Sequence, residues 1–184
     1  MKAIIYDKLF DGIDNELKLD WTLLIEKRHI VAAGPSSAID LPQSAEVINT
    51  NGLTVIPGLI DCHDHLASFG YEIAMKWDLT EQESHRHLRI ASVLKQTLIS
   101  GYTTVRDAGG LAAGFREAVD EGLVPGPRLL ISVGIISPTG GIGEHLSPSG
   151  YGTPFKNDPS LPSGVATGPR EMRAKVREMV RAGA

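Results

Sequence analysis

Cysteine is almost absent from the sequence, since Cys62 is the single cysteine among 184 residues. One cysteine cannot form an intramolecular disulfide, so the sequence excludes the class of small secreted domains that disulfides stabilise. The chain runs from Met1 and Lys2 directly into a short strand-like segment and shows no signal-peptide core. These features predict a cytoplasmic protein.

Long apolar runs and an excess of positive charge are also missing. No uninterrupted apolar stretch approaches the roughly 20 residues that a membrane-spanning helix needs. Lysine and arginine together number 18 against 22 acidic residues, and the net charge of −4 gives no electrostatic reason to expect nucleic acid or an anionic membrane as a partner. The hydrophobic content of 42% is instead typical of a globular protein with a buried core.

A pair of histidines follows an apolar run in the stretch 55–65, VIPGLIDCHDH. If this run is a strand, alternation places His63 and His65 on one face, which is a geometry for binding a metal ion. The alternative is that two polar residues simply leave the core at a strand end. Their position at the end of a buried strand favours a site, because parallel α/β proteins build sites there.

The same alternation sorts the neighbours of the two histidines. Asp61 would share their face and could support a metal site from behind, without binding the metal itself, whereas Asp64 would point away. Cys62 would also point away and pack among helices as a small apolar group.

Three motifs carry a resemblance to a known family. The stretch 57–65, PGLIDCHDH, resembles the first-strand signature of the metal-dependent amidohydrolase superfamily. The stretch 100–110, SGYTTVRDAGG, resembles its second-strand segment. GPR at 126–128 followed by SPTGG at 137–141 resembles the third, in the branch of imidazolonepropionase-like and prolidase-like enzymes. The resemblance implies a (β/α)8 barrel in which His63 and His65 bind one or two divalent metal ions, with zinc as the expected metal.

Length limits how much of that barrel this chain can supply, because a (β/α)8 barrel needs roughly 200 residues or more. We therefore expect an α/β fold that is the N-terminal portion of a TIM-like barrel. Residues 56–184 would form its first three β/α units, and residues 1–55 a small β-sandwich segment, incomplete alone. Residues 17–25 alternate between apolar and polar side chains, as in a half-buried antiparallel strand. The chain would belong to a larger enzyme or to a split one.

The helix and strand after the first motif have clear sequence signals. Thr80 and Glu83 could form a capping box for a helix over residues 80–98, and a strand over 102–105 follows. His85 and His87 lie within that helix, where successive residues are about 100° apart, so their rings diverge and receive no metal role.

The remaining elements continue the alternation of helix and strand. A helix over residues 111–119 precedes an apolar run over 129–136, which predicts a strand covered on both faces. Gly168 and a proline open a last helix in which Glu171 and Lys175 are placed as an i,i+4 pair.

The resemblance implies hydrolysis of a C–N bond in an amide, peptide-like or cyclic amide substrate by metal-activated water. Two imidazoles are fewer than the three protein ligands of a typical catalytic zinc. In the family, the other ligands and a proton-transferring aspartate come from later strands, so no catalytic residue is expected in this segment. The partners would be a small amide or dipeptide-like molecule, the remaining barrel strands from the same or a second chain, and further copies in a homo-oligomer. The alternative is a non-catalytic binding or structural half-barrel that associates with another chain.

The stretch 137–167 has no periodicity and is predicted to be a lid over the carboxyl end of the third strand. Its Gly-rich start lacks the lysine of a phosphate-binding loop, which excludes a nucleotide site. Thr139, Gly140 and His145 are candidate substrate contacts. The family places a histidine directly after the two glycines, where this chain has Ile142, so His145 is either a shifted equivalent or an ordinary loop residue.

Two further residues have open alternatives. Tyr71 could line the mouth of the barrel and contact substrate, or simply pack. Asp107 could orient a metal-binding histidine or a loop backbone without touching the metal, or cap the turn at Gly109 and Gly110 through its side chain.

Overall fold

The structure is a computed structural model that describes residues 1–50, 52–68, 82–144 and 159–184. The chain divides into two compact units, Met1–Pro57 and Gly58–Ala184. Within the described ranges, no helix combines the length and the apolar character that crossing a membrane requires.

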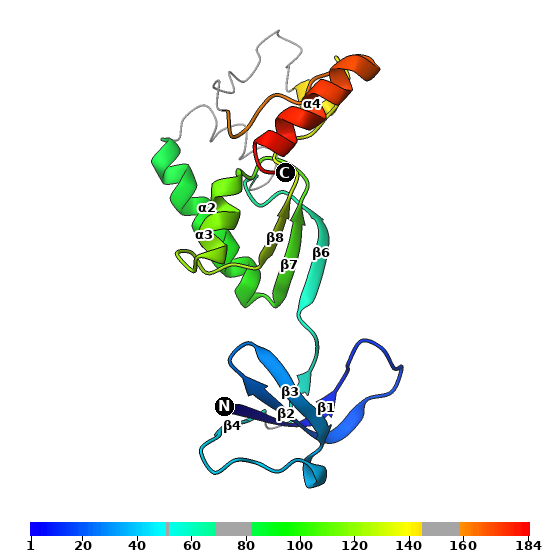
Figure 1. Cartoon of the computed structure of the whole chain (residues 1–184), viewed down its shortest axis with the longest axis vertical. Coiled ribbons are helices and arrows are strands. Elements are labelled where there is room, and N and C mark those ends of the chain that lie inside the picture. The colour runs from blue at the N-terminus through cyan, green and yellow to red at the C-terminus, as the bar shows by residue number, and fades with distance from the viewer. Residues whose placement is uncertain (51, 69–81, 145–158) are drawn as a thin grey trace. The chain divides into compact units, whose positions relative to one another are not determined.

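The first unit is built on a five-stranded sheet in the order β3-β2-β1-β4, with β5 also paired to β1 (Figure 1). β1 and β2 pair antiparallel, as do β2 and β3, whereas β4 and β5 run parallel to β1. Tyr6, Leu9 and Leu23 form its buried core. The described part of this unit contains one sheet, so the sandwich remains a prediction. The strands are β1 Lys2–Leu9, β2 Lys18–Glu26, β3 His29–Pro35, β4 Glu46–Asn49 and β5 Thr54–Val55, with a 3-10 helix at Ser36–Ala38.

The strand predicted over residues 17–25 is present as β2, but its alternation is incomplete. Thr22, Leu23 and Leu24 are buried in succession. The register with β3 shifts between Leu24 and Ile25, so the alternation of the strand is interrupted there. The Thr22 hydroxyl is satisfied inside the unit by the Ser36 hydroxyl at 2.8 Å.

The second unit has three parallel strands in sequence order, with helices between them (Figure 1). α2 joins β6 to β7, and α3 joins β7 to β8, so the β/α order predicted from the sequence is confirmed. Both helices lie on one side of the sheet. The elements are β6 Leu59–Asp64, α2 Glu83–Ile99, β7 Tyr102–Asp107, α3 Ala113–Asp120, β8 Arg128–Ile131, the 3-10 helix η2 Ile142–Glu144 and α4 Pro169–Arg181.

The core of this unit lies between the helices and one face of the sheet. It contains buried side chains from α2, β7, β8, the turn after β8 and α4, namely Ile90, Leu94, Val105, Leu129, Ile131, Val133 and Met179. The opposite face is open, since Ile60 of β6 is 66% exposed and Leu130 of β8 is 54% exposed. The third strand is also shorter than the predicted 129–136. It ends at Ile131, and Val133 follows with φ 65°, which is incompatible with an extended strand.

Helix starts differ in detail from the sequence predictions. α2 begins at Glu83 with Gln82 as its N-cap, so the predicted start at Thr80 is wrong, and Thr80 lies outside the described residues.

In α4 the predicted pair of Glu171 and Lys175 is replaced by two other contacts. The Glu171 carboxylate accepts the N–H of Thr167 at 2.7 Å, and Lys175 donates to Glu178 at 2.8 Å. A carboxylate in the first helical turn is drawn to the unpaired N–H groups there.

Gly58, which opens the second unit, allows β6 to pass close to β7. A Cβ at Gly58 would overlap Oγ1 and Cγ2 of Thr103. We predict that Gly58→Ala lowers the free energy of unfolding by about 1–3 kcal/mol through overpacking, measured by chemical denaturation. Gly114→Ala is the matched control. Gly114 lies in α3 with nothing within 4 Å of an added Cβ, so this change should stabilise by up to about 1 kcal/mol. Equal effects of the two changes would contradict the packing argument.

Candidate metal centre

β6 delivers two imidazoles side by side at its carboxyl end. The ring centroids of His63 and His65 are 5.3 Å apart, with the ring planes at 81°. Both backbones are held by carboxylates, because Asp61 Oδ1 accepts the N–H of His63 at 2.9 Å and Asp64 Oδ1 accepts the N–H of His65 at 2.7 Å. The local hydrogen bonds therefore fix the backbone that carries the two rings.

The alternation predicted for Asp61 and Asp64 is wrong, because β6 contains a register shift. Asp61 lies opposite Val105 and Asp64 opposite Asp107, so three steps along β6 match two steps along β7. Val105 and Asp107 are both fully buried. Asp61 and Asp64 accordingly line one cavity of about 300 Å³, which is also lined by residues of α2. Such a bulge re-aims the side chains that follow it.

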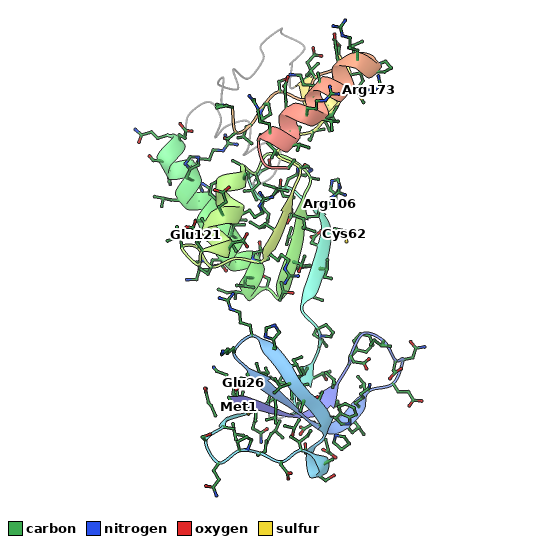
Figure 2. All side chains as sticks on the ribbon, in the orientation of Figure 1. Met1, Glu26, Cys62, Arg106, Glu121 and Arg173 are labelled. Atoms are coloured by element: carbon green, nitrogen blue, oxygen red, sulfur yellow. The ribbon has the colours of Figure 1, made fainter. Side chains whose placement is uncertain are left out.

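Cys62 also differs from its predicted position. Its side chain is exposed and does not pack among helices. In Figure 2 it projects from β6 on the side away from α2 and α3. Asp61 lies opposite the fully buried Val105, so ordinary alternation places the next residue, Cys62, on the open face together with Ile60.

The ring of His65 has a defined hydrogen-bond partner. Its Nδ1 lies 3.0 Å from the carbonyl oxygen of Gly109. A carbonyl oxygen only accepts, so Nδ1 must carry the proton, and in the neutral ring Nε2 then keeps its lone pair. A metal-binding histidine commonly has this arrangement, with one ring nitrogen donating to a carbonyl and the other facing the metal. The donor chemistry of His65 therefore fits a metal ligand.

Asp107 is fully buried at the end of β7. Its Oδ2 accepts the N–H of Leu66 at 2.7 Å, and its Oδ1 accepts the N–H of Gly109 at 3.0 Å. Burial raises the pKa of the Asp107 carboxyl above its ordinary value, although the two N–H bonds and the nearby His65 oppose that shift. The bond to Gly109 is the turn cap considered from the sequence, and the bond to Leu66 reaches the residue next to His65.

His63 and His65 are the candidate metal ligands among the described residues. Among the described residues, no group of three or more His, Cys, Asp or Glu side chains is arranged to hold a metal ion. The other His-x-His pair, His85 and His87, lies on α2, and the His87 ring contacts the ring of Phe115 at 5.6 Å. His63 and His65 fit two positions of a metal site that requires at least one more protein ligand.

The loop after β8 uses its own side chains to satisfy its polar groups. The N–H of Gly140 donates to Glu144 Oε2 at 2.6 Å, and the Thr139 hydroxyl lies 2.9 Å from the Thr167 hydroxyl. Thr139 and Gly140 thus have partners within the chain, and their role as substrate contacts stays a prediction. Tyr71 and His145 lie outside the described residues.

Sequence reasoning missed two parts of this site. The carbonyl of Gly109 has no side-chain signal, and only the paired glycines of the stretch 107–110 indicated an unusual backbone. The left-handed Val133 was also missed, because valine is among the residues least expected at positive φ.

Residues 54–184 match the model of the amidohydrolase family. The chain belongs to this family. It is 28% identical over 193 residues to ochratoxinase of Aspergillus niger, which covers 99% of this chain and 40% of that enzyme. It is 32% identical over 144 residues to imidazolonepropionase of Vibrio cholerae, which covers 74% of this chain and 30% of that enzyme.

Solved structures agree with this assignment. A crystal structure of a prolidase complexed with N-methylphosphonate-L-proline superimposes with a TM-score of 0.82 and 29% identity, over 100% of this chain and 44% of that chain. The predicted fold class is therefore confirmed: the amidohydrolase chain is the N-terminal portion of a (β/α)8 barrel with a preceding β segment. It spans less than half the length of these relatives.

Proposed function

We propose that the complete amidohydrolase is a metal-dependent hydrolase of C–N bonds in small amide or dipeptide-like molecules. His63 and His65 would be two of its metal ligands. The observation that supports this most directly is the bond from His65 Nδ1 to the Gly109 carbonyl, because it leaves Nε2 with a lone pair, in a ring whose centroid is 5.3 Å from that of His63. Zinc is the proposed metal, since neutral imidazoles suit it well, and one or two ions are consistent with the ligand types.

The residues of this chain would bind and orient rather than transfer protons. The metal would supply a Lewis acid that lowers the pKa of water and polarises the scissile carbonyl. His63 and His65 would bind it as neutral ligands, while Asp61 and Asp64 hold their backbones. We propose that the further ligands and the proton-transferring group come from barrel strands beyond this chain, supplied by the same or a second polypeptide.

The substrate class is proposed from what the relatives have in common. Their names, ochratoxinase, imidazolonepropionase and prolidase, describe different substrates that share a hydrolysable C–N bond. We therefore propose a small amide, peptide-like or cyclic amide substrate. Tyr71, Thr139, Gly140 and His145 stay proposed substrate contacts, and His145→Ala would test that role by changing kcat or KM without removing the metal.

The experiment that tests this function compares metal-free and zinc-loaded complete protein on a panel of Xaa-Pro dipeptides, N-acyl amino acids and matched esters. We expect release of free amine from at least one amide class, only in the zinc-loaded protein, with loss on addition of a chelator. Equal rates with and without metal would contradict metal dependence. Zinc binding with no turnover of any amide would instead favour the non-catalytic half-barrel.

A further inference from the structure

The loop that follows β7 is tied to three separate parts of the second unit. The carbonyl of Gly109 accepts from the His65 ring, at the end of β6. The N–H of Gly109 donates to Asp107, at the end of β7. The N–H of Gly110 donates to the carbonyl of Val133 at 2.9 Å, just after β8. The position of the carbonyl that meets His65 is therefore set by hydrogen bonds to both neighbouring strand ends.

The backbone of this loop requires glycine. Gly109 has φ 143° and Gly110 has φ 101°, both in the region that L side chains rarely adopt. A Cβ at Gly109 would lie 2.8 Å from Cγ1 of Ile135 and 3.3 Å from the carbonyl carbon of Gly134. The loop thus approaches the chain after β8 too closely for any other residue at position 109.

The contact on the β8 side is made by a strained turn. Val133 has φ 65°, and the N–H of Gly134 donates to the carbonyl of Ser132 at 2.7 Å, which closes a γ-turn around Val133. A buried β-branched residue in this conformation costs of order 1–3 kcal/mol and persists only when its surroundings fix it. The turn places the Val133 carbonyl where it accepts from Gly110.

Asp107 connects the loop to β6 through both carboxylate oxygens. One oxygen accepts from Leu66, the residue after His65, and the other accepts from Gly109, whose carbonyl meets the His65 ring. A carboxylate has two acceptor oxygens, whereas an amide presents one acceptor and one donor. Asparagine at this position could satisfy only one of the two N–H groups and would oppose the other.

We propose that Asp107 is a positioning residue for His65: its carboxylate sets the Gly109 carbonyl and the backbone at Leu66, which holds the His65 ring as the Nδ1–H tautomer with Nε2 available to the metal. The expected effect of Asp107 on metal affinity rests on the proposed function. Its effect on the His65 tautomer does not, because the tautomer can be measured in the metal-free protein. Gly109, Gly110 and the turn at Val133 support Asp107 by fixing the loop from the other side.

The test uses the complete protein with ¹⁵N-labelled histidine, freed of metal, at about pH 8, well above the ordinary histidine pKa of about 6.5. Imidazole ¹⁵N spectra report which ring nitrogen carries the proton, and His65→Gln assigns the signals. In the unchanged protein, we expect the proton of His65 on Nδ1. In Asp107→Asn, we expect a mixture of the two tautomers and a roughly 10–100-fold loss of Zn²⁺ affinity, measured by competition with a chelating dye.

Two further variants separate positioning from general damage. Asp120→Asn makes the same chemical change at the exposed end of α3 and should alter neither readout. Gly110→Ala perturbs the loop without steric overlap, since its Cβ would have only ordinary contacts at 3.8 Å, while its φ of 101° disfavours alanine. It should shift the tautomer in the same direction as Asp107→Asn, and it decides the question if Asp107→Asn does not fold.

The proposal is overturned if the unchanged protein carries the His65 proton on Nε2, or if folded Asp107→Asn and Gly110→Ala keep both the tautomer and the Zn²⁺ affinity. Failure of the proposed function gives a different result. In that case the unchanged protein binds no Zn²⁺, yet His65 still has its proton on Nδ1 and loses that preference in Asp107→Asn.

Discussion

Replacing His63 and His65 together with alanine should remove the metal from the complete protein and reduce hydrolysis to the background rate. The two rings lie 5.3 Å apart at the end of β6 and are the proposed ligands that this chain contributes. A catalytic metal supplies several kcal/mol of transition-state stabilisation, so its loss should lower turnover by at least roughly 10³-fold. Metal content by mass spectrometry and amine release on the best amide substrate measure the two effects.

The chain contains a matched control for this change. His85 and His87 have the same His-x-His spacing but lie on α2, where successive side chains diverge by about 100°. Replacing both with alanine should leave metal content and turnover in place, apart from any loss of stability where the His87 ring contacts Phe115. If the protein without His63 and His65 retains its metal and its rate, the assignment of these residues is wrong.

Residues 1–184 expressed alone should self-associate. β6 and β8 are the two edges of the three-stranded sheet, and each edge offers unpaired backbone groups. The face of that sheet opposite α2 and α3 is also open, with Ile60 and Leu130 more than half exposed. In a closed barrel, that face would be the packed interior. Sedimentation should therefore show species larger than the 19.7 kDa monomer.

Two lysine substitutions test the source of that association. Leu130→Lys places a charge on the open face of β8 and should shift the distribution towards monomer. Leu123→Lys changes another exposed leucine, 73% accessible and outside the strands, and should have little effect. A monodisperse, cooperatively unfolding monomer of the unchanged segment would contradict the interpretation of an open barrel surface.

The order of strands and helices could be predicted because it depends on periodicity that the sequence displays. The apolar run before His63, the stripes on α2 and α3, and the proline that opens α4 each carry a local signal that the fold retains. The spacing of His63 and His65 also indicated two neighbouring rings, and their centroids are 5.3 Å apart even though the bulge between Asp61 and Asp64 includes His63.

The details that sequence reasoning missed depend on backbone geometry set by tertiary contacts. The bulge in β6 lies between Asp61 and Asp64 and brings Asp64 to the same side as Asp61, and no residue type in the motif signals it. The end of β8 is set by Val133 at positive φ, against the preference of valine. Asp107 caps the turn at Gly109 as one of the two alternatives had it, and its second oxygen accepts from Leu66 after β6, a contact with no sequence signal; its role towards a metal-binding histidine stays a proposal.

The central claim is that His63 and His65 together bind the metal, and zinc K-edge X-ray absorption of the zinc-loaded complete protein tests it most directly. We predict imidazole scattering around zinc in the unchanged protein and in the variant lacking His85 and His87. The same signal should be weakened or lost, along with the metal, in the variant lacking His63 and His65. An unchanged imidazole environment around bound zinc in that last variant would contradict the claim.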